Sequence, residues 1–190
     1  LHRETYLVGG FVRDKLMGRP TTDLDFVCIG DALELAEQAA AQFKPKPKVD
    51  LFKTFGTAHF QLRSDPPIDI EFVGARKESY QYTSRNPSVT PGTLQDDQER
   101  RDFTINAMAV PFLEILGDTP NPTFLDPTGG LDDLREARVR HCAGAFIADP
   151  VRMLRGYRLC ASLGFQLDDT TKEEIRQQAP LIVNVAAERI

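Results

Sequence analysis

Short runs of apolar residues, some alternating with polar ones, predict the strands of a sheet in the first half of the chain. These runs cover residues 5–8, 24–29, 58–63 and 68–73. Residues 12–17, before Gly18, predict a short helix, and the alanine-rich run 32–43 predicts a longer helix with Asp31 as its N-cap. The first half of the chain therefore combines strands with helices.

The segment from residue 77 to residue 99 is polar and has no periodicity. Pro87, Pro91 and Gly92 interrupt it. The pattern predicts a loop of about twenty residues, and loops of this length are commonly functional or disordered.

A further helix is predicted over residues 149–163, where Pro150 suits the first turn. Apolar residues occur on nearly every side of this helix, which is typical of a buried one. It nevertheless carries Arg152, Arg155 and Arg158. Because burying an unpartnered guanidinium costs several kcal/mol, we expect these arginines to face anions or hydrogen-bond acceptors.

Two aspartates near the second predicted strand share one face. Successive side chains of a strand point to opposite sides, so Asp23 and Asp25 project together. Like charges repel, and divalent cations held by oxygen ligands offset such repulsion at sites of phosphoryl and nucleotidyl transfer. The simpler alternative for an Asp-x-Asp sequence is a solvated strand end or turn.

A second pair of acidic residues, Asp69 and Glu71, lies on one side of the strand 68–73, and the apolar residues lie on the other side. If this strand is beside the first acidic strand, it supplies a third carboxylate for a metal ion. The alternative is a solvent-facing edge strand.

Two glycines, Gly9 and Gly10, follow a short apolar run and precede a predicted helix. Backbone N–H groups at such a place can approach phosphates, and Arg13 would add positive charge. The alternative for an isolated Gly-Gly pair is a tight turn.

The segment RRDFTINAMA begins with Arg100, Arg101 and Asp102. Adjacent arginines offer forks of donors for phosphate oxygens, and the Asp102 carboxylate can accept hydrogen bonds from ribose hydroxyls. The alternative is that Arg101 and Asp102 form a surface ion pair.

Asp149, Arg152 and Arg155 step along one flank of the predicted helix, whereas Arg158 lies on the opposite side and is better suited to anchoring the fold. Cytosine and adenine both present an amine donor beside a ring-nitrogen acceptor, and guanine and uracil present the reverse order. A carboxylate beside a guanidinium can therefore select C and A without a nucleic-acid template. The alternative is that Asp149 caps the helix and forms a salt bridge with Arg152.

Composition narrows the class of protein only slightly. The 190 residues are 41% hydrophobic and 27% charged, as in an ordinary globular protein, and the net charge of -5 argues against a protein that coats nucleic acid. The three cysteines are widely spaced and suggest neither a disulfide framework nor a zinc site. No signal peptide or run of ~20 apolar residues is present, so we expect a cytoplasmic protein without membrane association. Because the sequence begins at Leu1 and not at Met, we expect it to be part of a longer chain.

Four of these segments together resemble the motifs of the class II CCA-adding enzyme and bacterial poly(A) polymerase family, the tRNA nucleotidyltransferases. They are GGFVRD followed by DLDF, RRDFTINAMA, LDPTGGLDDL, and the pair Asp149 and Arg152. In the family, a Glu usually precedes this Asp, and Ala148 replaces it here. The final residues, Ala187 to Ile190, resemble the start of the next family motif. The family comparison also favours Glu71 over Asp69 as the third carboxylate, because Glu71 lies five residues before an Arg.

The resemblance implies an α+β fold: a DNA-polymerase-β-like nucleotidyltransferase head, with a mixed sheet and flanking helices, over residues 1–140, then the start of an all-helical neck over residues 141–190. The implied reaction is template-independent addition of C and/or A from CTP or ATP to the 3′ end of tRNA, with release of pyrophosphate. The expected cofactor is Mg²⁺, and no DNA partner is expected. The expected metal ligands are Asp23, Asp25 and Glu71, the first two being catalytic. The expected nucleotide-binding residues are Gly9, Gly10, Arg13, Arg101, Asp102, Asp149, Arg152, Arg155 and Arg158.

Several activities share these motifs. Full CCA addition, CC addition, A addition and poly(A) tailing all remain open, and so does use of other RNA 3′ ends. A hypothesis from a different class is a non-catalytic module that binds nucleotides or RNA through a degenerate transferase fold. That module would require a damaged carboxylate set, whereas Asp23 and Asp25 are both present.

Overall fold

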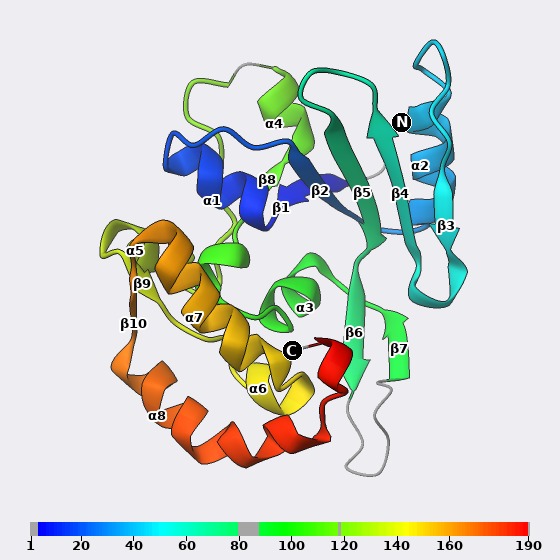
Figure 1. Ribbon diagram of the computed structural model, residues 1–190. Helices are drawn as coiled ribbons and strands as arrows, with labels where there is room; N and C mark the ends of the chain where they lie inside the picture. Colours follow the sequence, from blue (N-terminus) through cyan, green and yellow to red (C-terminus); the bar gives the residue numbers. More distant parts are fainter. Residues whose placement is uncertain (1–3, 80–87, 118, 190) are drawn as a thin grey trace. The chain divides into compact units, whose positions relative to one another are not determined.

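The computed structural model describes residues 4–79, 88–117 and 119–189 (Figure 1). The chain packs into two compact units. The first comprises residues Leu1–Asp97 and Ala109–Leu125, and the second comprises Gln98–Met108 and Asp126–Ile190.

A six-stranded mixed sheet forms the centre of the first unit. The strand order is β3 (Asp50–Phe52), β4 (Thr57–Leu62), β5 (Ile68–Gly74), β2 (Asp23–Cys28), β1 (Thr5–Val8) and β8 (Ala109–Pro111). β2 and β5 are parallel, and every other neighbouring pair is antiparallel. The four strands expected from the sequence are present within one residue of their predicted bounds. Because β5 is an interior strand, the edge-strand alternative for Asp69 and Glu71 is wrong.

Helix α2 (Ala32–Ala40) packs on β4 and β5 (Figure 1). Its predicted N-cap is confirmed, since the Asp31 carboxylate accepts hydrogen bonds from the N–H groups of Leu33 and Glu34. The helix ends three residues earlier than predicted. Two short helices, α1 (Gly10–Leu16) and α4 (Phe112–Leu116), pack on β1.

The loop predicted over residues 77–99 contains regular structure. β6 (Arg76–Ser79) and β7 (Ser88–Pro91) form an antiparallel ladder, and helix α3 spans Leu94–Glu99. At the start of α3, Thr93 and Asp96 bond reciprocally: the Asp96 carboxylate accepts from the Thr93 N–H, and the Thr93 hydroxyl accepts from the Asp96 N–H. This capping box was a readable signal in the sequence. Residues 80–87 of the predicted loop lie outside the described residues.

The second unit is mainly helical. Its elements are η2 (Thr104–Asn106), α5 (Gly130–Arg135), β9 (Arg138–Val139), α6 (Ala145–Ala148), α7 (Val151–Leu163), β10 (Gln166–Leu167), α8 (Asp169–Gln178), η3 (Ala179–Asn184) and η4 (Ala187–Arg189). Phe103, Phe146, Met153 and Ile175 belong to its core. Residues 141–190 were predicted to be all helical. The short strand β10, which pairs in parallel with β9, is the exception.

Helix α7 is less buried than its composition predicted. Only Met153 and Gly156 are buried, whereas Leu154 is 40% exposed and Tyr157 is 54% exposed. Gly156 lies against the Phe103 ring, where an added Cβ would come within 3.0 Å of the ring. One side of the helix therefore packs on the core, and apolar composition alone was not sufficient to predict burial of the others.

Two aspartates in the segment LDPTGGLDDL have structural contacts. Asp126 accepts hydrogen bonds from the N–H groups of Gly130 and Leu131, both at 2.8 Å. Asp133 is 1% exposed, and its oxygens contact Arg138 at 3.0 Å and Arg140 at 2.7 Å. This hydrogen bonding raises the pKa of Arg140. These contacts give the two aspartates of this segment a structural role.

The cysteines are free thiols. Cys28 and Cys142 are buried, and burial raises the pKa of Cys142 to about 12, so it stays protonated at neutral pH. Among the described residues, no helix has the length and apolar character that crossing a membrane requires.

Stability is expected to fall as the pH is lowered from 7 through the ordinary histidine pKa. Burial lowers the pKa of His141, whose Nδ1 lies 3.0 Å from the Thr171 hydroxyl. The unfolded chain therefore takes up a proton at a pH where the folded chain does not, which favours unfolding until the pH also falls below the folded pKa. Urea unfolding at pH 7.5 and 5.5 should show this loss, and His141→Gln should reduce it. An NMR titration placing the His141 pKa at or above its ordinary value would contradict the prediction.

Candidate active site

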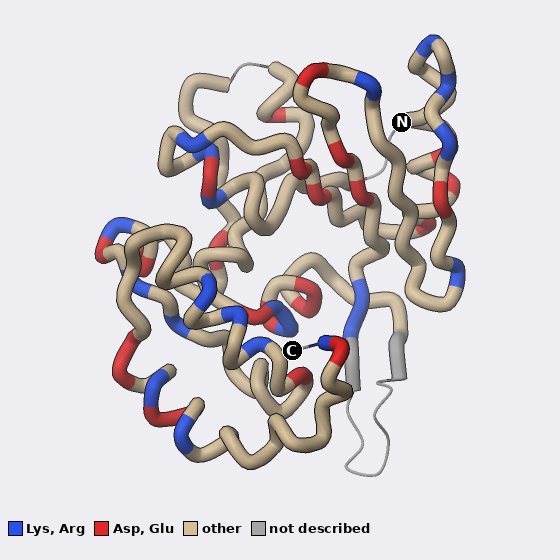
Figure 2. Tube along the Cα trace, viewed as in Figure 1, with Lys and Arg blue, Asp and Glu red and all other residues tan. Residues whose placement is uncertain are grey.

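Acidic side chains lie on two adjacent parallel strands of the first unit. Asp25 of β2 is directly opposite Glu71 of β5, and Asp23 is opposite Asp69. Figure 2 shows these acidic positions side by side on the two strands. Residues directly opposite each other share a face of the sheet. The other face buries Phe26 and Phe72, whose stacked rings have centroids 4.9 Å apart. The apolar face thus directs the carboxylates to the opposite side.

Two side chains of the neighbouring strand β4 contact the carboxylate of Asp69 in β5. His59 Nε2 lies 3.0 Å from the Asp69 carboxylate, and the Gln61 amide donates to the same oxygen at 3.1 Å. The Asp69 carboxylate is therefore hydrogen-bonded to β4. The register does not choose between the two acidic residues of β5, because Asp69 is opposite Asp23 and Glu71 is opposite Asp25, and Glu71 as the third carboxylate stays a prediction.

The donor set suits a hard divalent cation, which prefers carboxylate oxygens. Across the residues that the structure describes, however, no three acidic, histidine or cysteine side chains are grouped closely enough to hold a metal ion. The predicted ligands share one face without forming an assembled three-ligand cage. Further oxygen ligands, such as those of a triphosphate, would be needed to complete a coordination shell.

The glycine pair leads from β1 into α1. Gly9 is buried and has φ 71° and ψ -143°, a conformation that residues with a side chain rarely adopt. The Arg13 guanidinium lies beside Gly10 and contacts the Asp14 carboxylate through Nε and Nη2, both at 2.9 Å. Arg13 is therefore at the predicted position beside the glycines, with a carboxylate of its own helix as partner.

A polar pocket of about 160 Å³ lies within the second unit. Its lining residues are Arg100, Arg101, Asp102, Arg152 and Arg155. Four arginines around a single carboxylate give the pocket a positive charge, which suits a phosphate or another anion. Four of these five residues were predicted to bind nucleotide, and the structure brings them together from segments 50 residues apart in sequence.

Asp102 is only 6% exposed, so it does not lie on the surface as the alternative from the sequence assumed. One of its carboxylate oxygens accepts hydrogen bonds from the Phe103 N–H at 2.8 Å and the Asn106 amide at 3.2 Å. The other oxygen contacts Arg155 Nη2 at 2.8 Å. These contacts hold the carboxylate in one orientation within the pocket.

Asp149 and Arg152 have separate partners. Arg152 Nη1 donates to the Arg100 carbonyl at 2.8 Å. The Asp149 carboxylate accepts from the Val151 N–H at 3.2 Å and from Arg189 Nη2 at 2.8 Å. The alternative proposed from the sequence is therefore half right, because Asp149 bonds to the first turn of α7 but its recorded ion-pair partner is Arg189.

Two further arginines, Arg158 and Arg189, are not among the residues that line this pocket. Arg158 is exposed and does not line the pocket. Arg189 was not predicted as a site residue. The available signal for Arg189 was the resemblance of residues 187–190 to a family motif.

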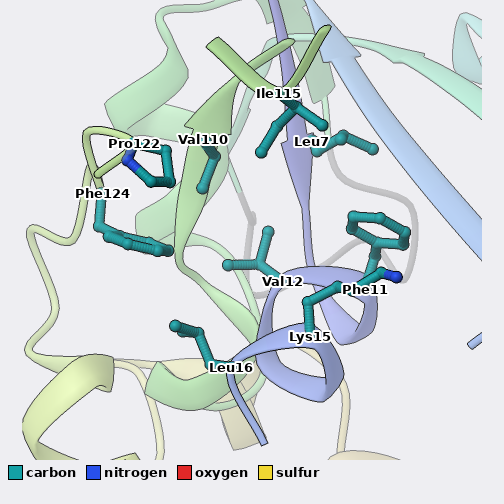
Figure 3. Close-up of a pocket in the computed structure, with 9 residues that line it drawn as sticks. All are labelled: Leu7, Phe11, Val12, Lys15, Leu16, Val110, Ile115, Pro122 and Phe124. Carbon is teal, nitrogen blue, oxygen red and sulfur yellow. The ribbon is translucent and has the colours of Figure 1, made fainter. Parts of the chain in front are cut away.

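A pocket in the first unit is apolar and is distinct from the acidic face. It has a volume of about 270 Å³, and Figure 3 shows its lining by α1, β1, β8, α4 and the segment after α4. Leu7 of β1 lines it and is opposite Phe26, whereas the next residue, Val8, is opposite Asp25. The pocket therefore opens on the side of the sheet away from the carboxylates, and its apolar walls do not suit a triphosphate.

The mixed sheet carries carboxylates in register on two adjacent strands, and the chain also forms an arginine-lined pocket, as expected of a nucleotidyltransferase head. The chain belongs to the poly(A) polymerase head domain family, whose model matches residues 5–140.

Curated relatives agree with this assignment. The chain is 42% identical over 179 residues to an A-adding tRNA nucleotidyltransferase of Aquifex aeolicus, covering 93% of this chain and 20% of the relative. It is 37% identical over 186 residues to a multifunctional CCA protein of Xylella fastidiosa, covering 93% and 39%. It is 35% identical over 189 residues to a CC-adding tRNA nucleotidyltransferase of Geobacter sulfurreducens, covering 97% and 38%. The chain thus spans between one fifth and two fifths of these relatives.

Solved structures show the same fold. A tRNA-processing enzyme with CTP matches with a TM-score of 0.76 and 37% identity, over 95% of this chain and 44% of that one. A tRNA nucleotidyltransferase complexed with a primer tRNA and an incoming ATP analog matches with a TM-score of 0.75 and 37% identity, over 94% and 47%.

Proposed function

We propose that the protein transfers nucleotidyl groups from CTP and/or ATP to the 3′ end of tRNA and releases pyrophosphate. The observation that carries this proposal is the register that puts Asp25 opposite Glu71 with Asp23 on the same face. The names of the relatives, which are A-adding, CC-adding and CCA enzymes, support tRNA as the acceptor. Such a reaction belongs in the cytoplasm, where we propose that the protein acts.

Divalent metals are general in nucleotidyltransferases, and we propose Mg²⁺ here, held by Asp23, Asp25 and Glu71. When bound, the metal lowers the pKa of the attacking 3′ hydroxyl and neutralises charge on the triphosphate. The protein then needs no side-chain general base. The 3′ oxygen forms a bond to the α-phosphorus while the bond from that phosphorus to the bridging oxygen of the β-phosphate breaks, so pyrophosphate leaves and the hydroxyl proton passes to solvent. The carboxylates of Asp23, Asp25 and Glu71 would hold the metal ion.

The phosphates and the ribose are assigned to separate groups of residues. The backbone N–H groups at Gly9 and Gly10, with the Arg13 guanidinium, are proposed to bind phosphate oxygens. Arg101 adds a fork of donors, and Asp102 is proposed to accept hydrogen bonds from the ribose hydroxyls. The fixed orientation of the Asp102 carboxylate supports that role, because an oriented acceptor loses little entropy when the ribose binds.

Base selection is assigned to Asp149 and Arg152. An ionised carboxylate accepts a hydrogen bond from the exocyclic amine of C or A, and a guanidinium donates to the adjacent ring nitrogen. Uracil and guanine present a carbonyl and an N–H at those places, which leaves both protein groups unpaired or in repulsion. Arg155 and Arg158 are proposed to add positive charge for the nucleotide. Arg155 has the stronger support, because it lines the pocket.

The proposed division of labour is a catalytic head over residues 1–140 and the start of a helical neck over residues 141–190. The extent of the family match, residues 5–140, supports the first boundary. The compact units divide differently, because residues 98–108 pack with the helical part. In this proposal the carboxylates belong to the head and the base-reading pair belongs to the neck.

Incorporation assays with single nucleotides test the proposed function. A tRNA lacking its 3′ CCA is incubated with the protein, Mg²⁺ and each NTP separately, and products are sized on a gel. We expect extension with CTP, with ATP or with both, and at least about tenfold less with UTP or GTP. The product lengths distinguish CCA, CC, A and poly(A) addition. Equal use of all four nucleotides, or nucleotide binding without any extension, would contradict the proposal.

A further inference from the structure

Arg189 forms an ion pair with the residue proposed to read the base. Its Nη2 lies 2.8 Å from Asp149 Oδ2, and the two residues are 40 positions apart in the chain. Asp149 lies between α6 and α7 in an extended conformation, and its other oxygen, Oδ1, accepts the Val151 N–H at 3.2 Å. Both carboxylate oxygens are therefore held, one by the main chain and one by Arg189.

We infer that Arg189 is a positioning residue for nucleotide selection, a role that rests on the proposed function. Two partners on the two oxygens fix the plane of the Asp149 carboxylate, which would otherwise rotate about its terminal torsion. Each carboxylate oxygen can accept more than one hydrogen bond, so the ion pair leaves acceptor capacity for an incoming amine. Arg189 thus holds the acceptor in place without occupying it completely.

The orientation of the Asp149 carboxylate determines which bases it can serve. A carboxylate accepts hydrogen bonds and does not donate them, so it favours the amines of C and A and disfavours the carbonyls of U and G. Arg189 Nη2, 2.8 Å from Oδ2, fixes where these acceptor oxygens lie. Removing Arg189 frees the carboxylate to rotate, so that its oxygens no longer stay aligned with the amine of C or A.

A purely structural role predicts a different result. The Arg189 side chain is 57% exposed and that of Asp149 is 26% exposed, and ion pairs this exposed contribute little to folding. If the pair only braced the fold, its loss would alter stability slightly and would leave the preference among nucleotides unchanged.

The test compares Arg189→Ala and Arg189→Lys with Arg176→Ala, a matched control that removes an exposed arginine with an i,i+3 partner in α8. Steady-state incorporation is measured for CTP, ATP and UTP. For Arg189→Ala we expect the KM for CTP and ATP to rise about tenfold, with kcat changed by less than about threefold, and the preference over UTP to fall about tenfold. Arg189→Lys should recover part of the preference because it retains the charge, and Arg176→Ala should match the parent protein.

The outcomes separate this inference from the proposed function. A parent protein without preference for C or A would overturn the proposed function. A selective parent protein with an equally selective Arg189→Ala variant would overturn the role of Arg189 alone. Circular dichroism confirms folding, and if Arg189→Ala does not fold, Arg189→Gln carries the same expectation because it loses the charge and retains a polar side chain.

Discussion

Replacing Asp23 with alanine is expected to lower nucleotide incorporation by about a hundredfold to a thousandfold, while the protein stays folded. The carboxylate is proposed to hold the metal at which charge develops in the transition state, and losing one such electrostatic contact typically costs this much. Asp23 is exposed at the start of β2, so no buried partner is left unsatisfied. Its removal also relieves repulsion from neighbouring carboxylates. Incorporation rates with CTP and ATP, together with the melting temperature, check the prediction.

Asp50→Asn is the matched control for this experiment. Asp50 of β3 is opposite His59, which is opposite Glu71, so it lies on the same face of the sheet but at its edge strand. Its recorded partner is the exposed Lys48 at 2.6 Å. We expect Asp50→Asn to retain the parent rate. Turnover retained by Asp23→Ala would refute the metal assignment, and an equal loss in Asp50→Asn would indicate a general effect of charge on this face.

Replacing Gly130 with alanine is expected to lower the free energy of unfolding by about 3 kcal/mol or more. A Cβ at this position would lie 2.7 Å from the carbonyl carbon of Thr104 and 3.1 Å from Met108 Cγ. Thr104 cannot easily move, since its hydroxyl donates to the buried Asp133 at 2.6 Å and its N–H donates to the Arg140 carbonyl at 2.9 Å. Urea unfolding followed by circular dichroism measures the change.

Gly164→Ala provides the comparison. Gly164 ends α7 with φ 72°, and no atom lies within 4 Å of an added Cβ. The cost there is only that of a side chain in the left-handed region, about 1 kcal/mol. Equal losses for the two variants would show that steric contact with Thr104 is not the reason that position 130 is a glycine.

Local patterns predicted the elements that carry the acidic residues. Alternation in β5 placed Ile70 and Phe72 in the core and Glu71 on the other face, and the structure confirms it. Asp31 was recognised as a cap because its contacts are with the next two or three residues. The prediction of a loop was wrong for residues 77–79 and 88–91, because the ladder between β6 and β7 forms through main-chain hydrogen bonds that polar side chains do not reveal, and for residues 94–99, which form α3.

The sequence by itself determined that Asp23 and Asp25 share a face, because the period of a strand is two and depends only on consecutive residues. Only the tertiary structure decided that Glu71 is opposite Asp25, because the pairing of strands separated by a helix and two other strands follows from long-range packing of their apolar faces. The same is true of the Asp149–Arg189 pair, whose members are brought together by the packing of the helices between them. The local spacing of residues in the sequence thus identified the candidate site residues, and tertiary packing determined which residues lie beside them.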